Sequence, residues 1–360
     1  MKKPLAAPAP KQAVEVNDRK AAHLDACRDE SVDLKRDSFD RLKLRYNALP
    51  NIALSDVSAE TEFAGKRIAA PILISSMTGG AGARFRSINR NLAEAAERLN
   101  LPLGLGSMKV MLSHPGAAAS FRVRDIARRV PLIANLGLVS FNYGVRFEDL
   151  ERIREVVQAD VLALHLNALQ EAVQPGGDTD FRGLLRHLEH LVQRCTIPVM
   201  VKECGGGIAP GLVRTLLEMG VRYIDISGND GTSWAAVEGL ANGGDPMGEL
   251  FKDFGLPTAW ILERLPQALQ GGPSSKGRIV AGGGMRNGLQ MAKALALGAD
   301  YVSVARPFLI AAELSADAVI EVAERLMREL KTAMFLMGVQ RVAQLDRSLF
   351  AEGYGPAVER

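Results

Sequence analysis

Eight short apolar segments recur along this chain, and they constrain its fold more than any other feature. Each ends in small or polar residues, and amphipathic segments lie between them. Segments that are apolar on both faces are typical of parallel strands covered on both sides. Eight strand–helix units predict an α/β fold, a closed (β/α)₈ TIM barrel. The predicted strands are 71–77, 101–107, 131–137, 161–167, 197–203, 223–228, 278–283 and 301–306, and the amphipathic segments are 88–99, 147–157, 181–193, 212–219 and 289–297.

A doubly wound parallel sheet is the alternative fold. Such sheets usually have fewer strands and a glycine-rich first turn. No such fingerprint follows the first apolar segment of this chain. The strand count therefore favours the barrel.

The residues before the barrel form two parts. The chain begins MKKPLAAPAPKQ, which lacks the continuous apolar stretch of a signal peptide, and we expect residues 1–16 to be a disordered tail. Residues 17–70 are predicted to be an N-terminal extension. Its stretch 17–31 is charged and helical in character, and Asn17 can cap that helix.

Residues 71–345 are predicted to form the barrel, and residues 346–360 a C-terminal tail. The connection 234–276, after the sixth apolar segment, is unusually long. In a barrel an insertion of this kind often forms a lid over the site.

Composition excludes several classes of partner. The net charge is +3, from 44 basic and 41 acidic residues, whereas a nucleic-acid surface usually shows a clustered basic face. No apolar run approaches the length of a membrane-spanning helix. The three cysteines have no CxxC spacing and suit reduced thiols. We therefore expect a cytoplasmic protein that acts on a small molecule, with no nucleic-acid or membrane partner.

The segments that follow the last two predicted strands have the character of an anion site. Loops after strands 7 and 8 of such barrels commonly bind phosphate through backbone N–H groups and a helix N-terminus. Here they read GGGMRNG (282–288) and Ala305-Arg306. The glycines let the backbone approach an anion, and Arg286 or Arg306 can add charge; tight turns without any ligand are the alternative.

Two other strand ends carry unexpected polar residues. Lys202 ends an otherwise apolar strand, where it either pairs with Glu203 or Asp225 or faces a cofactor ring of anionic character. The first strand runs into Gly79-Gly80, a pair that would let a flat ring lie close to the backbone.

The stretch ALHLNALQE (163–171) ends in four polar side chains of different chemistry, which is unlike an ordinary turn. Arg19, Lys20 and His23 span about one helical turn and can share a face. For so short a basic run, a solvated helix surface is the alternative.

Together these motifs resemble type 2 isopentenyl diphosphate isomerase, a flavoenzyme family of isoprenoid synthesis. The matching stretches keep the family's order from residue 19 to about 306: RKAAH, NALP, SSMTGG, GLGSMK, ANLG, HLNALQE, DGTSW and GGGMR. The resemblance implies a (β/α)₈ barrel that interconverts isopentenyl and dimethylallyl diphosphate. It also implies bound FMN that must be reduced, NADPH as the reductant, Mg²⁺, and a homo-oligomer, either a tetramer or an octamer.

The resemblance also assigns roles to residues. Gln170 would be the catalytic residue beside the substrate, and Glu171 would hold Mg²⁺. The substrate would contact Arg19, Lys20, His23, Ser107, Met108, Lys109, His165, Asn167 and Gln170. FMN would contact Ser76, Met77, Thr78, Ser107, Asn135, Lys202, Ser227, Thr232, Gly283, Gly284, Arg286, Ala305 and Arg306.

Three positions depart from the family's pattern. Lys109 and Thr179 stand where arginine is usual, and Ala209 stands where serine is frequent. Lysine cannot grip a phosphate with two parallel hydrogen bonds, so the first two departures bear on substrate affinity more than on the type of reaction.

The residues at the strand ends also argue against three other functions. A 2-hydroxy acid oxidase requires a histidine base after the seventh strand, but the chain has no histidine beyond His190. A relative of IMP dehydrogenase requires a cysteine after the sixth strand, where the sequence of this chain is GNDGTSW and contains no cysteine. A non-catalytic FMN-binding protein would not need Gln170, Glu171 or the RKAAH stretch, all of which are present.

Overall fold

Eight parallel strands close into a barrel, as the sequence predicts. The computed structural model describes residues 10–265 and 277–356. Each barrel strand falls within one predicted apolar segment, and the strands neighbour one another in the order β10-β3-β4-β5-β6-β7-β8-β9. The doubly wound alternative is therefore wrong. The barrel strands are β3 (Ile72–Ile74), β4 (Leu103–Gly104), β5 (Leu132–Gly137), β6 (Val161–Leu166), β7 (Val199–Glu203), β8 (Tyr223–Asp225), β9 (Arg278–Ala281) and β10 (Tyr301–Val304).

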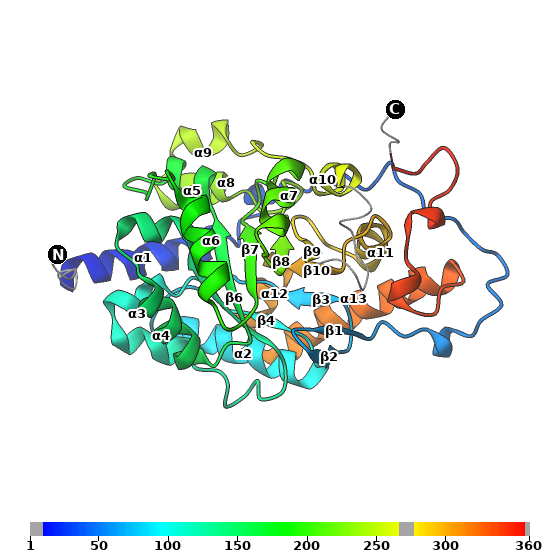
Figure 1. The fold of residues 1–360 in the computed structure, drawn as a ribbon, viewed down its shortest axis with the longest axis horizontal. Coiled ribbons are helices and arrows are strands. Elements are labelled where there is room, and N and C mark those ends of the chain that lie inside the picture. Colours follow the sequence, from blue (N-terminus) through cyan, green and yellow to red (C-terminus); the bar gives the residue numbers. More distant parts are fainter. Residues whose placement is uncertain (1–9, 266–276, 357–360) are drawn as a thin grey trace.

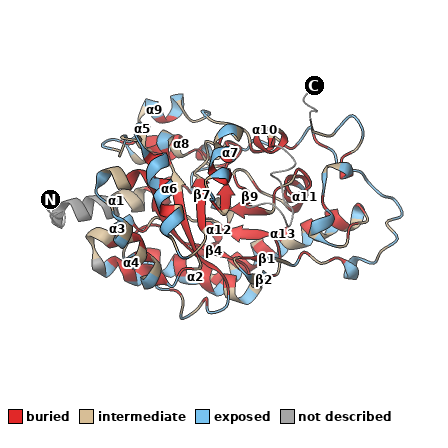
Figure 2. Ribbon diagram, viewed as in Figure 1, coloured by how far each residue is buried: buried red, intermediate tan, exposed pale blue. Residues whose placement is uncertain are grey.

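Helices surround the barrel and bury one face each against it (Figures 1 and 2). All six residues of β5 are buried, as expected for a strand covered on both faces. The five predicted amphipathic segments correspond to α2, α4, α6, α7 and α11. The helices are α1 (Pro10–Ala26), α2 (Ala83–Leu99), α3 (Lys109–Ser113), α4 (Phe147–Val157), α5 (Ala168–Val173), α6 (Leu184–Arg194), α7 (Pro210–Glu218), α8 (Trp234–Ala241), α9 (Pro246–Leu250), α10 (Thr258–Arg264), α11 (Gly288–Ala296), α12 (Arg306–Ala312) and α13 (Ala316–Leu336).

A hairpin plugs the amino-terminal end of the barrel. Strands β1 (Thr61–Phe63) and β2 (Lys66–Ile68) pair antiparallel around Ala64 and Gly65, which both have positive φ, as a tight hairpin turn requires. The ring of Phe63 packs 4.5 Å from that of Tyr223 and 5.1 Å from that of Tyr301, measured between centroids. Because these tyrosines begin β8 and β10, the hairpin closes this end, and a site can lie only at the carboxyl ends of the strands.

The two ends of the chain differ from expectation. Helix α1 begins at Pro10, well before the predicted start at Asn17, so residues 10–16 are helical; residues 1–9 lie outside the described residues. The expected C-terminal tail packs against the N-terminal extension instead, because Phe350 is buried and forms a β-bridge with Leu44. Residues 357–360 lie outside the described part of the chain.

The long connection after β8 holds α8, α9 and α10, and residues 266–276 of it lie outside the described residues. Helix α8 packs against both α1 and α5. Figure 1 shows α8 and α9 next to α5, with α10 further along the same side of the molecule, toward α11. The connection thus supplies a wall over the site.

Candidate active site

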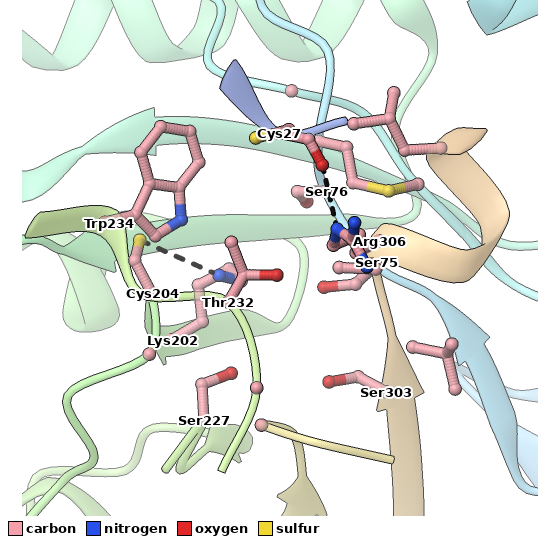
Figure 3. Close-up of a pocket in the computed structure, with 18 of the residues that line it drawn as sticks. Cys27, Ser75, Ser76, Lys202, Cys204, Ser227, Thr232, Trp234, Ser303 and Arg306 are labelled. Atoms are coloured by element: carbon pink, nitrogen blue, oxygen red, sulfur yellow. Dashed lines mark hydrogen bonds between the residues drawn. The ribbon is translucent and has the colours of Figure 1, made fainter. Parts of the chain in front are cut away.

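One cavity lies at the carboxyl ends of the strands, and residues from most of the predicted motifs surround it (Figure 3). It encloses about 1350 Å³ of empty space, which includes the solvent at its open mouth. The predicted site residues that line it are Lys20, His23, Ser76, Met77, Ser107, Asn135, His165, Gln170, Lys202, Ser227, Thr232, Gly283, Gly284, Arg286, Ala305 and Arg306.

The remaining predicted residues lie behind this lining. The hydroxyl of Thr78 is buried and donates to Asn89 of α2. Met108 is fully buried in the core, and its main-chain N–H donates to the carbonyl of Asn135. Arg19 and Glu171 adjoin the lining residues Lys20 and Gln170 in the sequence, and the buried Asn167 lies 3.4 Å from the amide oxygen of Gln170. Lys109 is half exposed and does not line the cavity.

Glu238 organises the end of the cavity that α1 covers. This glutamate of α8 is fully buried. Its carboxylate lies 3.0 Å from Nε2 of His23 and accepts a hydrogen bond of 2.7 Å from Nε2 of Gln170. Burial acts to raise the pKa of Glu238, but the hydrogen bonds from His23 and Gln170 and the charge of Lys20 outweigh it and lower that pKa. An ionised carboxylate therefore ties α1 to α5 through α8.

The two basic residues of α1 that line the cavity are held in a low-dielectric setting. Burial and then the charge of Arg19 lower the pKa of Lys20, against the effects of Glu238 and Glu171. Burial also lowers the pKa of His23, although its hydrogen bond to Glu238 acts in the opposite direction. A neutral His23 donates from Nε2 to Glu238, which leaves Nδ1 buried and without a hydrogen-bond partner among the described residues. Nδ1 is therefore available to a ligand.

The HLNALQE stretch forms a connected polar network. Asn167 donates to Oε1 of Glu171 at 2.7 Å and lies 3.4 Å from the amide oxygen of Gln170. The other oxygen of Glu171 accepts the main-chain N–H of Asp178 at 2.7 Å. Because Gln170 gives its NH₂ to Glu238, the carbonyl end of its amide is the end that faces Asn167.

His165 is a neutral member of the site. Its Nδ1 lies 3.0 Å from Oδ1 of Asn135. Burial, followed by the charges of Lys202, Lys20 and Lys109, lowers the pKa of His165 to about 3. The neutral ring therefore carries its proton on Nδ1 and acts as a hydrogen-bonding group rather than as a charge.

Lys202 extends into the cavity without a salt bridge. Its Nζ donates to the main-chain carbonyl of Glu203 at 2.7 Å, and in the described part of the chain no carboxylate lies within ion-pair distance of it. Burial acts to lower the pKa of Lys202, but electrostatic interactions with Cys204, Asp225 and Glu203 outweigh it and raise that pKa. The side chain of Glu203 instead accepts hydrogen bonds from the main chain of Gly205, Gly206 and Gly207. Lys202 is thus a charged donor facing the cavity.

The glycines after β9 form a cradle that fits a phosphate. Gly283 and Gly284 have φ of 87° and 78° and line the cavity. A Cβ on Gly283 would come within 2.1 Å of the carbonyl oxygen of Gly228, so only glycine fits. Their main-chain N–H groups have no acceptor among the residues that the structure describes. With the start of α12 beside them, these donors suit the phosphate of a cofactor such as FMN.

The two arginines expected at this cradle have a different immediate role. Arg286 forms an ion pair of 2.5 Å with Asp33, and Arg306 lies 3.5 Å from the same carboxylate. Arg306 also donates to the carbonyl of Cys27 at 2.8 Å (Figure 3). Both guanidinium groups therefore fasten the segment that follows α1 to the rim of the cavity.

Gly79 and Gly80 are explained by packing within the loops. A Cβ on Gly79 would lie 2.8 Å from the carbonyl oxygen of Ser107, and one on Gly80 would lie 2.4 Å from the ring of Phe85. The missing side chains make room for neighbouring protein groups. This packing differs from the expected reason, close approach of a flat ring, although Gly79 does line the cavity.

Each departure from the family pattern has a distinct setting. Lys109 begins α3, is half exposed, and forms an ion pair with Asp178. Thr179 is exposed on the same loop. Ala209 precedes α7 as its N-cap, where it makes no side-chain cap, whereas serine would accept a hydrogen bond from the first turn. Only Lys109 bears directly on the site.

Sequence reasoning missed Glu238, Trp234, Asp33 and Ser303. All but Glu238 line the cavity directly. One pattern could have indicated Glu238, because it is the only charged residue in the otherwise apolar helix WAAVEGLA. A lone charge of this kind on a buried helix needs a partner at close range.

Comparison with known proteins identifies the family. A family model described as FMN-dependent dehydrogenase matches residues 14–119 and 181–352. An isopentenyl-diphosphate delta-isomerase of Paracoccus zeaxanthinifaciens is 41% identical over 330 residues, which cover 91% of this chain and 94% of the relative. One from Synechococcus sp. is 42% identical over 323 residues, covering 88% and 91%. The chain belongs to the isopentenyl-diphosphate delta-isomerase family.

Solved structures agree with the barrel. A flavocytochrome b2 variant has a TM-score of 0.68 at 18% identity, covering 97% of this chain and 88% of that one. A mandelate oxidase variant has a TM-score of 0.59 at 21% identity, covering 91% and 89%. At this identity the likeness concerns the fold alone. This isomerase-family chain therefore shares its barrel with FMN-dependent oxidoreductases.

The described residues of this isomerase-family chain contain neither a cluster of metal ligands nor a membrane-spanning helix. No three or more histidine, cysteine, aspartate or glutamate side chains there form a group that could hold a metal ion. No helix in the described ranges combines the length and apolar character needed to cross a membrane.

Proposed function

We propose that this chain interconverts isopentenyl and dimethylallyl diphosphate, with reduced FMN in the cavity and Mg²⁺ on the diphosphate. One observation carries the proposal: the cradle after β9, the basic residues of α1 and Gln170 all line the same cavity. The named relatives support the reaction, and the FMN-dependent family model supports the cofactor.

The residues present fit FMN. The N–H groups of Gly283 and Gly284 would hold its phosphate, and Lys202 would face the ring as a charged donor. Serines 76, 107 and 227 and Asn135 supply polar groups along the cavity between these points. When bound and reduced, the flavin would supply an exchangeable proton at its ring edge and an electron-rich face. None of the described side chains is an obvious strong acid for protonating an alkene.

The residues of α1 would hold the diphosphate. Lys20 brings a partly buried amino group, and the Nδ1 of His23, which has no hydrogen-bond partner among the described residues, lines the same cavity. An anion beside a histidine favours the protonated ring. His23 would therefore take up a proton as the substrate binds, and donate from Nδ1 to the diphosphate while Nε2 stays on Glu238.

Gln170 would lie beside the isoprenoid double bond. It is buried and neutral, and Glu238 fixes the orientation of its amide. A neutral polar group does not compete as a base with the reacting carbon, but its dipole tolerates a developing positive charge. Trp234, next to His23 with ring centroids 5.6 Å apart, excludes water from the same wall.

Glu171 would contribute one carboxylate to Mg²⁺. Both of its oxygens already accept a hydrogen bond from protein donors, which fixes the carboxylate but leaves lone pairs free. Mg²⁺ usually keeps several waters and needs only one or two carboxylates when phosphate oxygens complete its shell. This demand is compatible with a site that offers a single glutamate.

An oxidase of 2-hydroxy acids is the second candidate, since the fold is shared with such enzymes. The loop after β9 reads Gly282-Gly283-Gly284-Met285-Arg286 and supplies no base. The proposed isomerase activity gives the hydrogen-bond network around Gln170 and Glu238 a role, whereas oxidation of a 2-hydroxy acid does not require it.

The decisive experiment follows product and reductant together. The anaerobic protein with FMN is supplied with isopentenyl diphosphate and Mg²⁺, and NADPH or dithionite reduces the flavin. We expect no turnover before reduction and many product molecules for each NADPH consumed, because moving a double bond changes no oxidation level. One NADPH oxidised per product would refute the isomerase.

A further inference from the structure

The floor of the cavity contains a hydrogen-bonded group made of Asp225, Ser227 and Ser303, of which the family resemblance assigns a role to Ser227 alone. Asp225 ends β8 and is almost fully buried. Its Oδ1 accepts the hydroxyl of Ser227 at 2.8 Å and the N–H of Ser227 at 3.2 Å. Its Oδ2 accepts the hydroxyl of Ser303, from β10, at 2.9 Å. One carboxylate thus joins two strands that are not neighbours.

The strand between them leaves room for this group. β9 lies between β8 and β10, and Gly282 follows it. A Cβ on Gly282 would come within 2.5 Å of Oδ1 of Asp225 and of the hydroxyl of Ser303. Ser227 itself has a φ of 24°, an uncommon value for a residue with a side chain. The two hydrogen bonds from Ser227 to Asp225 hold it there.

The direction of these hydrogen bonds determines what the serines offer a ligand. A carboxylate can only accept, so each serine must give its single hydroxyl proton to Asp225. Ser227 and Ser303 both line the cavity, and Figure 3 shows them on opposite sides of its lower part. Only their lone pairs remain for the cavity, so the floor presents two acceptors.

The chemistry that fits two acceptors is a chain of hydroxyl donors. Gly228, next to Ser227, donates its N–H to the carbonyl of Gly282 at 3.2 Å, which places the floor directly beside the phosphate cradle. In FMN the polyol chain is the part adjoining the phosphate.

We propose that Asp225 orients Ser227 and Ser303 as paired acceptors for the polyol hydroxyls of the flavin. This inference rests on the proposed function, because it takes the cavity to hold FMN. Asp225 would act as a positioning residue, since it touches the serines and not the ligand. An asparagine at this position would donate to one serine and turn that hydroxyl proton toward the cavity, where it would oppose a polyol donor.

The test compares two flavins on wild-type protein, Asp225→Asn and Ser303→Ala. One flavin is FMN, and the other carries a phosphopentyl chain, which keeps the ring and the phosphate but lacks the hydroxyls. Binding is titrated by quenching of flavin fluorescence, and thermal unfolding of the apo proteins checks folding. We expect wild type to prefer FMN by about tenfold or more, since each neutral hydrogen bond contributes about 1 kcal/mol. Both variants should lose FMN affinity and bind the phosphopentyl flavin as wild type does.

Each other outcome would overturn the inference in a recognisable way. Equal loss for both flavins would mean that Asp225 acts through the charge of Lys202 or through stability. Wild type that binds and isomerises with either flavin alike would remove the polyol site and leave the proposed function intact. Wild type that binds neither flavin would remove both. If Asp225→Asn does not fold, Ser303→Ala decides alone, because unchanged preference for FMN there refutes the acceptor role.

Discussion

Replacing Glu238 by glutamine tests how the buried network supports the site. The fully buried carboxylate accepts from His23 at 3.0 Å and from Gln170 at 2.7 Å, one oxygen for each. Glutamine has the same shape but only one acceptor oxygen. Its NH₂ group would face either Nε2 of His23 or the NH₂ of Gln170, so one existing hydrogen bond must be lost or reversed.

The loss of one acceptor oxygen determines how far the Tm and the turnover of Glu238→Gln should change. If Glu238→Gln keeps its oxygen on Gln170, His23 must move its proton to Nδ1, which has no partner among the described residues. A buried donor left unsatisfied costs about 1–3 kcal/mol. At roughly 2–4 °C for each kcal/mol, the Tm of the apo protein should fall by several degrees. Turnover should fall by about tenfold, because the neutral amide oxygen holds the NH₂ of Gln170 more weakly than the carboxylate does.

The assay measures Tm by calorimetry and kcat and KM with isopentenyl diphosphate and reduced FMN. Glu249→Gln is the matched control, since Glu249 is exposed on α9 and pairs with Lys252 at the surface. The control should match wild type in both measurements. A Glu238→Gln variant with wild-type Tm and turnover would show that the network neither stabilises the fold nor orients Gln170.

Three further variants address single roles. Glu171→Gln should reduce Mg²⁺-dependent turnover and leave FMN bound; unchanged Mg²⁺ dependence would contradict its assignment as a ligand. Lys109→Arg should lower the KM for isopentenyl diphosphate or leave it unchanged, because a guanidinium can grip phosphate with two hydrogen bonds; loss of activity in a folded variant would give this position another role. His165 has a pKa of about 3 when folded and an ordinary value of 6.5, so the unfolded apo protein binds the extra proton between these values. Stability should therefore fall by at most about 1.4 kcal/mol per pH unit below 6.5, and His165→Gln should reduce that slope when urea unfolding is measured from pH 7 to 5.

The barrel could be predicted from the sequence because its strands are continuous apolar segments at regular spacing. A strand that is apolar on both faces must be buried on both faces, and a barrel surrounded by helices provides this. The β1–β2 hairpin escaped prediction because its strands have only three residues each and gain their stability from Tyr223 and Tyr301, which are distant in the sequence. Local pattern does not report such tertiary contacts.

Some residues of the candidate site could likewise be predicted from the sequence, and others could not. Lys202, Gly283 and Gly284 are visible in the sequence because each breaks the pattern of the strand or turn that carries it. Glu238 lies on a helix within an irregular connection, and its importance arises only when α8 meets α1 and α5. The sequence predicts that the glycine pair 79–80 makes room for a flat ring, and the structure shows that Ser107 and Phe85 lie where their side chains would be, although Gly79 also lines the cavity. A glycine indicates close approach but does not say by what.

The β1–β2 hairpin closes the amino-terminal end of the barrel, so the cavity opens only at the other end. With Phe63 seated between Tyr223 and Tyr301, no path leads out through the floor. If the cavity holds the ligands proposed above, the cofactor, the substrate and an electron donor must all enter from the end of the barrel at which the strands have their carboxyl ends. Ligands that share one entrance can block one another, so we expect the cofactor to bind before the isoprenoid, and a bound isoprenoid to keep an electron donor from reaching the cofactor. Excess substrate should therefore slow the first activation of the enzyme while leaving later turnovers untouched.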